Sequence, residues 1–267
     1  MGDTEDELTS GHPSAYRRET KTNRPVSMNQ LGPHSATWPD RDEDLWDGLR
    51  WGPELETDRE LKLLGDVKGK RVLVLGAGAG QLPVHLASIG AHVVVVDPRQ
   101  AALEATREAA EEREVRVELH QSDLAELAFV RADSVDRCVS LFALATIADL
   151  ARAFRQIHRV LKPGQALVFS HPHPAFALFD PASADPLRIR RSWWDQSPRS
   201  WKSQEGSGSE HPRTIEAVFT GLVRSGFSVD TILEPAPPEG ELRSPWASEL
   251  LRWVPATLVV RARKEGT

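Results

Sequence analysis

Segments typical of strands alternate with segments typical of helices through residues 71–174, and the pattern predicts five strands there. The strand-like segments are strongly apolar, as in AHVVVVD at 91–97, whereas PRQAALEATREAAEERE at 98–114 is rich in helix-forming Ala, Glu and Arg. A continuous apolar strand suits a parallel sheet that is covered on both faces. The alternation therefore predicts βαβ units and an α/β fold built around a parallel sheet.

The alternation breaks after this region. Residues 175–212 contain short apolar pieces and many turn residues, which we interpret as an insertion, or lid, over the ligand edge of the sheet. A helix at 214–227 and strands at 228–235 and 255–264 then complete the pattern.

The N-terminal region has a different composition. Residues 1–34 are polar and show no period, which predicts a mobile tail. Residues 35–57 mix acidic side chains with large aromatics and are predicted to form an arm that packs onto the rest. We expect a single domain over residues 35–267.

The totals exclude several classes of protein. A chain of 267 residues with 40% hydrophobic residues can bury a sizeable core. Its formal net charge of -6 gives no general attraction to nucleic acid or to an anionic membrane. Cys138 is the one cysteine, so no intramolecular disulfide can form. The N-terminus lacks the order of a signal peptide, and no apolar run approaches about 18–20 residues, so we expect a soluble cytoplasmic protein.

The stretch VLVLGAGAG at 72–80 is an apolar run that ends in alternating glycines. Glycine permits a positive φ and lets a ligand approach bare backbone, so Gly76, Gly78 and Gly80 are candidates for a binding loop. Open parallel sheets bind ligands beyond the carboxyl ends of their strands, which is where this loop falls. A plain tight turn between a strand and a helix is the alternative interpretation.

Two carboxylates favour a nucleoside ligand. Asp97 follows Gly80 by 17 residues and ends the second expected strand, where it could accept hydrogen bonds from both ribose hydroxyls. Asp123 ends the third, where it could meet an adenine amino group. A dinucleotide loop would read G-x-G-x-x-G, and Gln81 occupies the last position, which disfavours an NAD-dependent oxidoreductase.

The G-x-G-x-G pattern with an acid 17 residues later resembles the class I S-adenosylmethionine-dependent methyltransferases. The segment DRCVSLFALATIADLARAFRQIHRVLKPGQALVFS at 136–170 is similar to their fourth strand, helix and fifth strand, and the chain looks most like small-molecule enzymes of actinobacterial type. The resemblance implies a Rossmann-like seven-stranded sheet that is mostly parallel, with an antiparallel last strand. It also implies S-adenosylmethionine as cofactor and a small-molecule acceptor, methylated on oxygen or nitrogen.

The resemblance also assigns roles to individual residues. Its cofactor-binding positions fall on the glycine loop, on the ends of the second and third strands and just after the fourth: Gly76, Ala77, Gly78 and Gly80 for the methionine part, Asp97 and Pro98 for the ribose, Asp123 and Leu124 for the adenine, and Ser140 and Leu141 near the sulfonium.

Val74 departs from the family pattern. The family usually has Asp or Glu two residues before the first glycine, where the acid helps to hold the methionine amine. Losing one charged hydrogen bond would weaken cofactor binding by about 1.5–3 kcal/mol. Val74 therefore keeps a second hypothesis open, a non-catalytic nucleoside-binding protein derived from such enzymes.

The acceptor side offers weaker patterns. His171 and His173 in SHPHP are candidate general bases, although the same residues suit a turn that orders the exit of a strand, and no metal site is expected from two histidines. Basic and aromatic residues in the insertion, with one tryptophan of the arm, are candidates for holding an acidic or planar acceptor, or else form a solvated basic edge: Trp46, Arg191, Trp193 and Trp194. The sequence SLFA after the fourth strand lacks the Asn/Asp-Pro-Pro-aromatic motif, so a nucleic acid substrate is not expected, and a homodimer is compatible with the sequence.

Overall fold

A computed structural model of the chain describes residues 48–53, 55–180, 183–203, 206–237, 239–240, 242 and 249–266. The predicted tail at 1–34 lies outside the described residues. Trp46 also lies outside them, with the rest of the predicted arm as far as residue 47.

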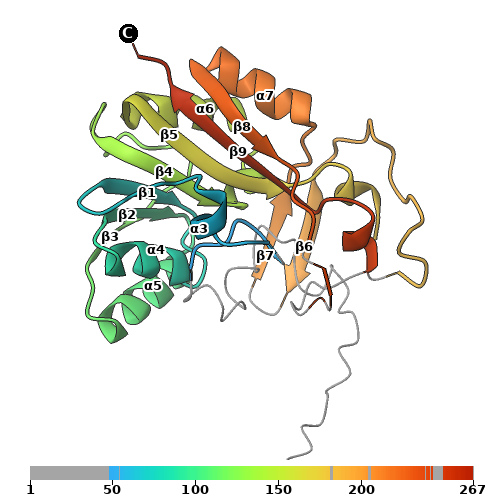
Figure 1. The fold of residues 1–267 in the computed structure, drawn as a ribbon, viewed down its shortest axis with the longest axis horizontal. Coiled ribbons are helices and arrows are strands. Elements are labelled where there is room, and N and C mark those ends of the chain that lie inside the picture. Colours follow the sequence, from blue (N-terminus) through green and yellow to red (C-terminus); the bar gives the residue numbers. More distant parts are fainter. Residues whose placement is uncertain are drawn as a thin grey trace, which may run out of the picture.

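One seven-stranded sheet dominates the described residues, with the strand order β3-β2-β1-β4-β5-β9-β8 (Figure 1). Strands β1 to β5 run parallel to one another, and β9 is antiparallel to both β5 and β8. The predicted sheet, mostly parallel with an antiparallel last strand, is confirmed. The strands are β1 Arg71–Leu75, β2 His92–Asp97, β3 Val117–Gln121, β4 Val135–Leu141, β5 Leu161–Pro172, β8 Phe227–Leu233 and β9 Thr257–Lys264.

Helices cover both faces of this sheet, as its apolar strands predict (Figure 1). In β1, Val72 and Val74 join the cluster of α4 and α5, whereas Leu73 and Leu75 join the cluster of α6 and α7. Successive side chains of a strand point to opposite faces, which explains the division. The helices are α4 Gln81–Ser88, α5 Gln100–Glu112, α6 Leu150–Val160 and α7 Ile215–Arg224.

Local signals fix where the helices begin and end. Helix α6 begins after Asp149, whose carboxylate accepts a hydrogen bond from the Arg152 amide, and α7 begins after Thr214, which caps it in the same way. Helix α3 covers only Asp58–Leu61, because Lys62 takes a left-handed conformation and ends it.

The strand order creates a switch point between β1 and β4. The chain moves from β1 outward to β3 and then returns to β4 on the other side of β1. Ligands of such sheets bind in the crevice outside the carboxyl ends of the strands at this point. The glycine loop follows β1 there, and a 3₁₀ turn, η2 Ala143–Thr146, follows β4.

The region predicted as an insertion contains a separate hairpin, β6 Arg199–Ser203 and β7 Gly206–Glu210, and a 3₁₀ turn, η3 Phe176–Leu178. The His211 amide, directly after β7, donates a hydrogen bond of 2.8 Å to the Ala145 carbonyl in η2. The hairpin therefore leads the chain back to the turn at the switch point. A further 3₁₀ turn, η4 Glu249–Arg252, precedes β9.

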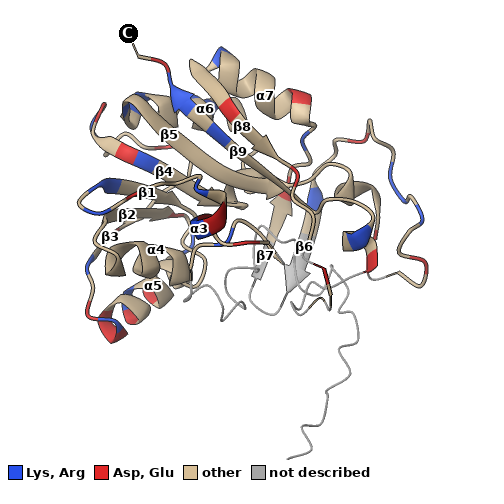
Figure 2. Cartoon of the chain, in the orientation of Figure 1, with Lys and Arg blue, Asp and Glu red and all other residues tan. Residues whose placement is uncertain are grey.

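Charged residues of both signs are interspersed over the described chain (Figure 2). Acidic positions are frequent on α5, and basic positions of β9 face an acidic position of β8, where Arg261 and Arg263 both pair with Asp230. Among the described residues, no helix combines the length and apolar character needed to cross a membrane.

Candidate functional site

The glycine loop adopts the conformation that its sequence predicts. Gly76, Gly78 and Gly80 have φ values of 90°, 58° and 88°, a region that other residues rarely adopt. Two of these glycines also serve packing inside the protein. A Cβ on Gly76 would collide with the Cβ of Ala143, and a Cβ on Gly80 would lie 2.6 Å from the Cα of Thr106. The outer two glycines are therefore needed whether or not a ligand binds.

Asp97 lies beside this loop. Its side chain is 2% exposed, and its Oδ2 accepts a hydrogen bond of 2.8 Å from the Ala77 amide. Its Oδ1 accepts one of 2.8 Å from the Arg99 amide, and the Arg99 guanidinium binds both oxygens at 3.1 Å. The end of β2 and the loop after β1 are thus joined through one buried carboxylate.

The adenine-side candidates lie beyond β3. Asp123 is exposed, and its Oδ1 accepts a hydrogen bond of 2.7 Å from the Ala125 amide, while Leu124 is buried. Pro98 lies two residues before α5, and its carbonyl accepts a hydrogen bond from the Gln121 side chain. Because Asp123 is exposed, the position that the resemblance assigns to adenine is open to a ligand.

Ser140 and Leu141 are the last two residues of β4, not residues after it as the sequence suggested. Ser140 is fully buried, and its hydroxyl has no hydrogen-bond partner within the described chain. Phe142 follows with φ 59°, an unusual value for a side chain of its size, and no sequence pattern indicated it. Such backbone strain is frequent at functional sites, so Phe142 joins the candidate site.

Val74 is fully buried in the apolar cluster under α4 and α5, which also contains Trp51 and Leu82. Trp51 belongs to the predicted arm, and its indole donates a hydrogen bond of 2.9 Å to Asp58. An acidic side chain at Val74 would be desolvated there, so the usual family carboxylate is replaced by part of the core.

The two histidines after β5 have different surroundings. His173 is held at both ring nitrogens, since Nδ1 accepts from the Ala175 amide at 3.1 Å and Nε2 lies 2.8 Å from Glu234. His171, the penultimate residue of β5, is 1% exposed, and its Nε2 has no hydrogen-bond partner in the part of the chain described. Burial lowers the pKa of His171 to about 4, so its ring is neutral at pH 7. His171 is the freer of the two to interact with a ligand.

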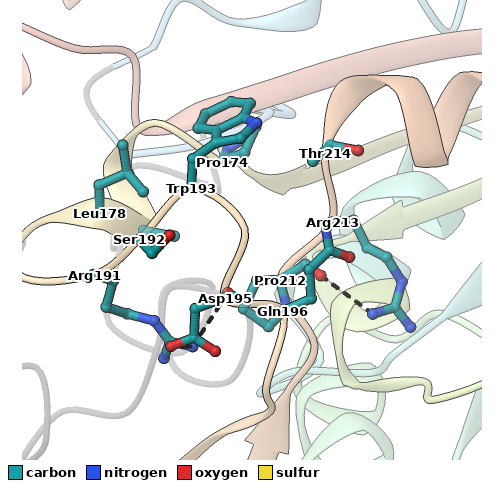
Figure 3. A pocket seen from close by; sticks show the side chains of 11 residues that line it. Pro174, Leu178, Arg191, Ser192, Trp193, Asp195, Gln196, Pro212, Arg213 and Thr214 are labelled. Atoms are coloured by element: carbon teal, nitrogen blue, oxygen red, sulfur yellow. Dashed lines mark hydrogen bonds and ion pairs between the residues drawn. The ribbon is translucent and has the colours of Figure 1, made fainter.

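The insertion brings two of its candidate substrate residues together. Arg191 and Trp193 line a cavity of about 20 Å³, roughly the space of one water molecule (Figure 3). Arg191 is engaged by its own loop, where its Nη2 lies 2.8 Å from Asp195 and 3.1 Å from the Ser197 carbonyl. Trp194 does not line this cavity and is 82% exposed.

Glu210 is a candidate that no sequence pattern indicates. It ends β7, is 3% exposed and precedes the residue that binds η2. Burial raises its pKa to about 7, although the positive charges of Arg199 and Arg191 oppose the shift. A carboxyl group that titrates near neutrality close to a ligand edge is suited to acid–base chemistry. The Ser/Gly-rich sequence of β7 gives no sign that this residue is buried.

Comparisons with known proteins agree with this geometry. Residues 73–169 match the model of the methyltransferase domain. A ubiquinone biosynthesis O-methyltransferase of Alkalilimnicola ehrlichii is 35% identical over 116 residues, 43% of this chain and 47% of that protein. A second protein of that name, from Hahella chejuensis, is 38% identical over 38% of this chain and 43% of its own length. The chain thus spans about half the length of these relatives.

The fold extends the similarity beyond that segment. The crystal structure of an S-adenosylmethionine dependent methyltransferase from Mesorhizobium loti superposes with a TM-score of 0.63 at 28% identity. The match covers 76% of this chain and 94% of that structure.

Proposed function

We propose that this chain, a member of the class I S-adenosylmethionine-dependent methyltransferase family, transfers a methyl group to an oxygen or nitrogen atom of a small molecule. The observation that carries the proposal is the buried carboxylate of Asp97, held against the glycine loop at Ala77. In this arrangement Asp97 can bind the ribose of the cofactor while the adjacent glycine loop binds the methionine part attached to that ribose.

The described residues fit the cofactor on its nucleoside side. Asp97 would accept hydrogen bonds from the ribose hydroxyls, and the exposed Asp123 would meet the adenine, whose face Leu124 would contact. Gly78, with a φ of 58°, would present bare backbone to the methionine part. Bound S-adenosylmethionine supplies an electrophilic methyl carbon on a sulfonium.

The acceptor requires mainly proximity and alignment, since methyl transfer is an in-line displacement. A hydroxyl acceptor also benefits from a base that takes its proton. His171 and Glu210 are the proposed groups, because both are buried near the switch point and each is able to accept a proton. The His171 ring is unprotonated at pH 7, and the Glu210 carboxyl is ionised as the pH rises through about 7. His173 would act as a positioning residue through its bonds to Ala175 and Glu234.

The relatives of named function suggest the first acceptors to test. Two of them are ubiquinone biosynthesis O-methyltransferases, so small hydroxylated aromatic compounds are reasonable probes for this chain. Trp193, which is 40% exposed, is the aromatic side chain of the insertion proposed to stack on a planar acceptor, since the cavity that it lines is too small to hold one. We also propose that the protein is cytoplasmic and that it assembles as a homodimer.

A second function is favoured by one observation. Val74 lies in the apolar core where the family has an acid, so the methionine amine loses a charged partner there. A protein that binds the nucleoside without transferring the methyl group would tolerate this loss.

Calorimetric titration of the full chain with S-adenosylmethionine, S-adenosylhomocysteine and NAD separates these functions. We expect both sulfur compounds to bind. In a separate assay with S-adenosylmethionine and a panel of phenols and amines, we expect one acceptor to gain about 14 Da, the mass of one CH₂ group. Binding of the sulfur compounds without any mass shift would favour the second function. Binding of NAD alone would contradict both.

A further inference from the structure

All the acceptor positions of the Asp97 carboxylate are filled in this structure. A carboxylate offers about four lone pairs, two on each oxygen. Oδ1 accepts from the Arg99 amide at 2.8 Å and from Arg99 Nε at 3.1 Å, and Oδ2 accepts from the Ala77 amide at 2.8 Å and from Arg99 Nη2 at 3.1 Å. No lone pair is left for a ribose hydroxyl.

The four donors differ in how easily they can leave. The amides of Ala77 and Arg99 belong to the backbone of the glycine loop and of the turn after β2, and their position is fixed. The guanidinium of Arg99 ends a flexible side chain that is 49% exposed, whereas the Asp97 side chain is 2% exposed. The arginine fork is therefore the one donor pair that a ligand can displace.

Arg99 is also an unfavourable residue for its place in the fold. It is the N-cap of α5, a position that favours Ser, Thr, Asp or Asn, and its side chain makes no capping bond. Its positive charge lies at the positive end of the helix dipole, which disfavours it further. Local helix stability therefore does not explain Arg99, whereas its fork on Asp97 does.

We propose that the Arg99 guanidinium occupies the ribose positions of Asp97 in the free protein and must leave before the cofactor binds. Arg99 then competes with the ribose hydroxyls for the Asp97 carboxylate and so lowers the affinity for the cofactor. The inference rests on the proposed function, since it takes Asp97 as the ribose carboxylate.

The fork explains why affinity depends on this side chain and not on the backbone donors. Replacing Arg99 keeps its amide, so Asp97 in Arg99→Ala still accepts two backbone hydrogen bonds and gains two free lone pairs. Arg99→Ser frees the same lone pairs and adds a residue suited to cap α5. Arg99→Lys keeps a positive charge but cannot form a bidentate fork.

The test is the calorimetric affinity of the full chain and its variants for adenosine, which is uncharged, and for S-adenosylhomocysteine. Both ligands should bind about 3- to 20-fold tighter to Arg99→Ala and Arg99→Ser, because they no longer have to break the partly exposed, charged hydrogen bonds between Arg99 and Asp97. Arg99→Lys should lie between these variants and the wild type. Thermal unfolding should show Arg99→Ser to be more stable than Arg99→Ala.

Arg107→Ala is the matched control, since Arg107 is exposed on the same helix and its removal changes the net charge equally. Its affinity should equal that of the wild type. Wild-type binding of adenosine with equal or weaker binding by Arg99→Ala and Arg99→Ser would overturn the inference and leave the proposed function standing. Absence of binding of both ligands by the wild type and by every Arg99 variant would overturn both.

Discussion

At the carboxyl ends of β1 and β2, the buried Asp97 accepts hydrogen bonds at both oxygens, whereas around the ends of β4 and β5 several buried polar atoms have no partner in the described chain. We call the first region the cofactor half and the second, with the start of β9, the acceptor half. The unpartnered atoms of the acceptor half are the hydroxyls of Ser140, Ser170 and Thr257 and the Nε2 of His171.

The two halves differ because different backbone groups are available to hydrogen-bond their buried polar side chains. Asp97 ends its strand, so the amides of the turn behind it and of the neighbouring loop point at its carboxylate. Ser140 and Ser170 lie within strands, where the backbone amides and carbonyls are already paired in the sheet. The cofactor half therefore completes its polar contacts by itself, whereas the acceptor half retains unused donors and acceptors.

The largest expected effect is at the point where the two halves touch. In Gly76→Ala, the alanine would have to adopt the positive φ of Gly76, and its Cβ would collide with the Cβ of Ala143 in η2. The substitution should therefore reduce the free energy of unfolding by about 2–5 kcal/mol. Urea denaturation measures this change. Gly76→Ala combined with Ala143→Gly should recover the packing part of the loss and retain about 1–2 kcal/mol of backbone strain. A double variant no more stable than Gly76→Ala would disprove the contact between the halves.

An intermediate effect is expected from Glu210, beside the acceptor half. Its pKa is raised from 4.5 to about 7 by burial, so its contribution to stability is present in full below pH 4.5 and is lost as the pH rises through about 7. The loss should be on the order of 1–3 kcal/mol. The free energy of unfolding of wild type and Glu210→Gln, measured from pH 4.5 to pH 8, should differ in slope, with the variant flatter. Parallel curves would show that Glu210 is solvated in the folded protein.

The smallest effect is expected at Thr257. Thr257→Val keeps the shape of the side chain and removes a buried hydroxyl that has no hydrogen-bond partner in the described chain. Because no bond is lost, the free energy of unfolding should stay the same or rise by up to about 1 kcal/mol. Thermal unfolding checks this, with the wild type as the reference. A loss of more than 1 kcal/mol would mean that the acceptor half does satisfy this hydroxyl.

Much of the cofactor half could be predicted from the sequence, because its signals are local. Apolar strands, glycines that need positive φ and an acid at a strand end are all read within a few residues of one another, and the parallel sheet follows from their alternation. The placement of Asp97 beside Ala77 follows from the same logic, since neighbouring parallel strands end at one edge.

The features that the sequence did not indicate depend on contacts between distant segments or on side-chain conformation. The left-handed Phe142 is held where β4 meets η2, and its amide donates to the Ser170 carbonyl of β5. Glu210 is buried by the return of a hairpin whose sequence is polar. The Arg99 fork depends on the path of one side chain, and an Arg at that position otherwise suggests an exposed loop.

The most direct test of the account is the affinity for S-adenosylhomocysteine of Asp97→Ala beside Thr257→Val, measured by calorimetry on proteins whose folding is verified by thermal unfolding. We expect Asp97→Ala to weaken binding by about 1.5–3 kcal/mol, through lost charged hydrogen bonds, and Thr257→Val to leave it unchanged. Unchanged affinity in a folded Asp97→Ala, or equal losses in the two variants, would contradict the assignment of the cofactor to the ends of β1 and β2.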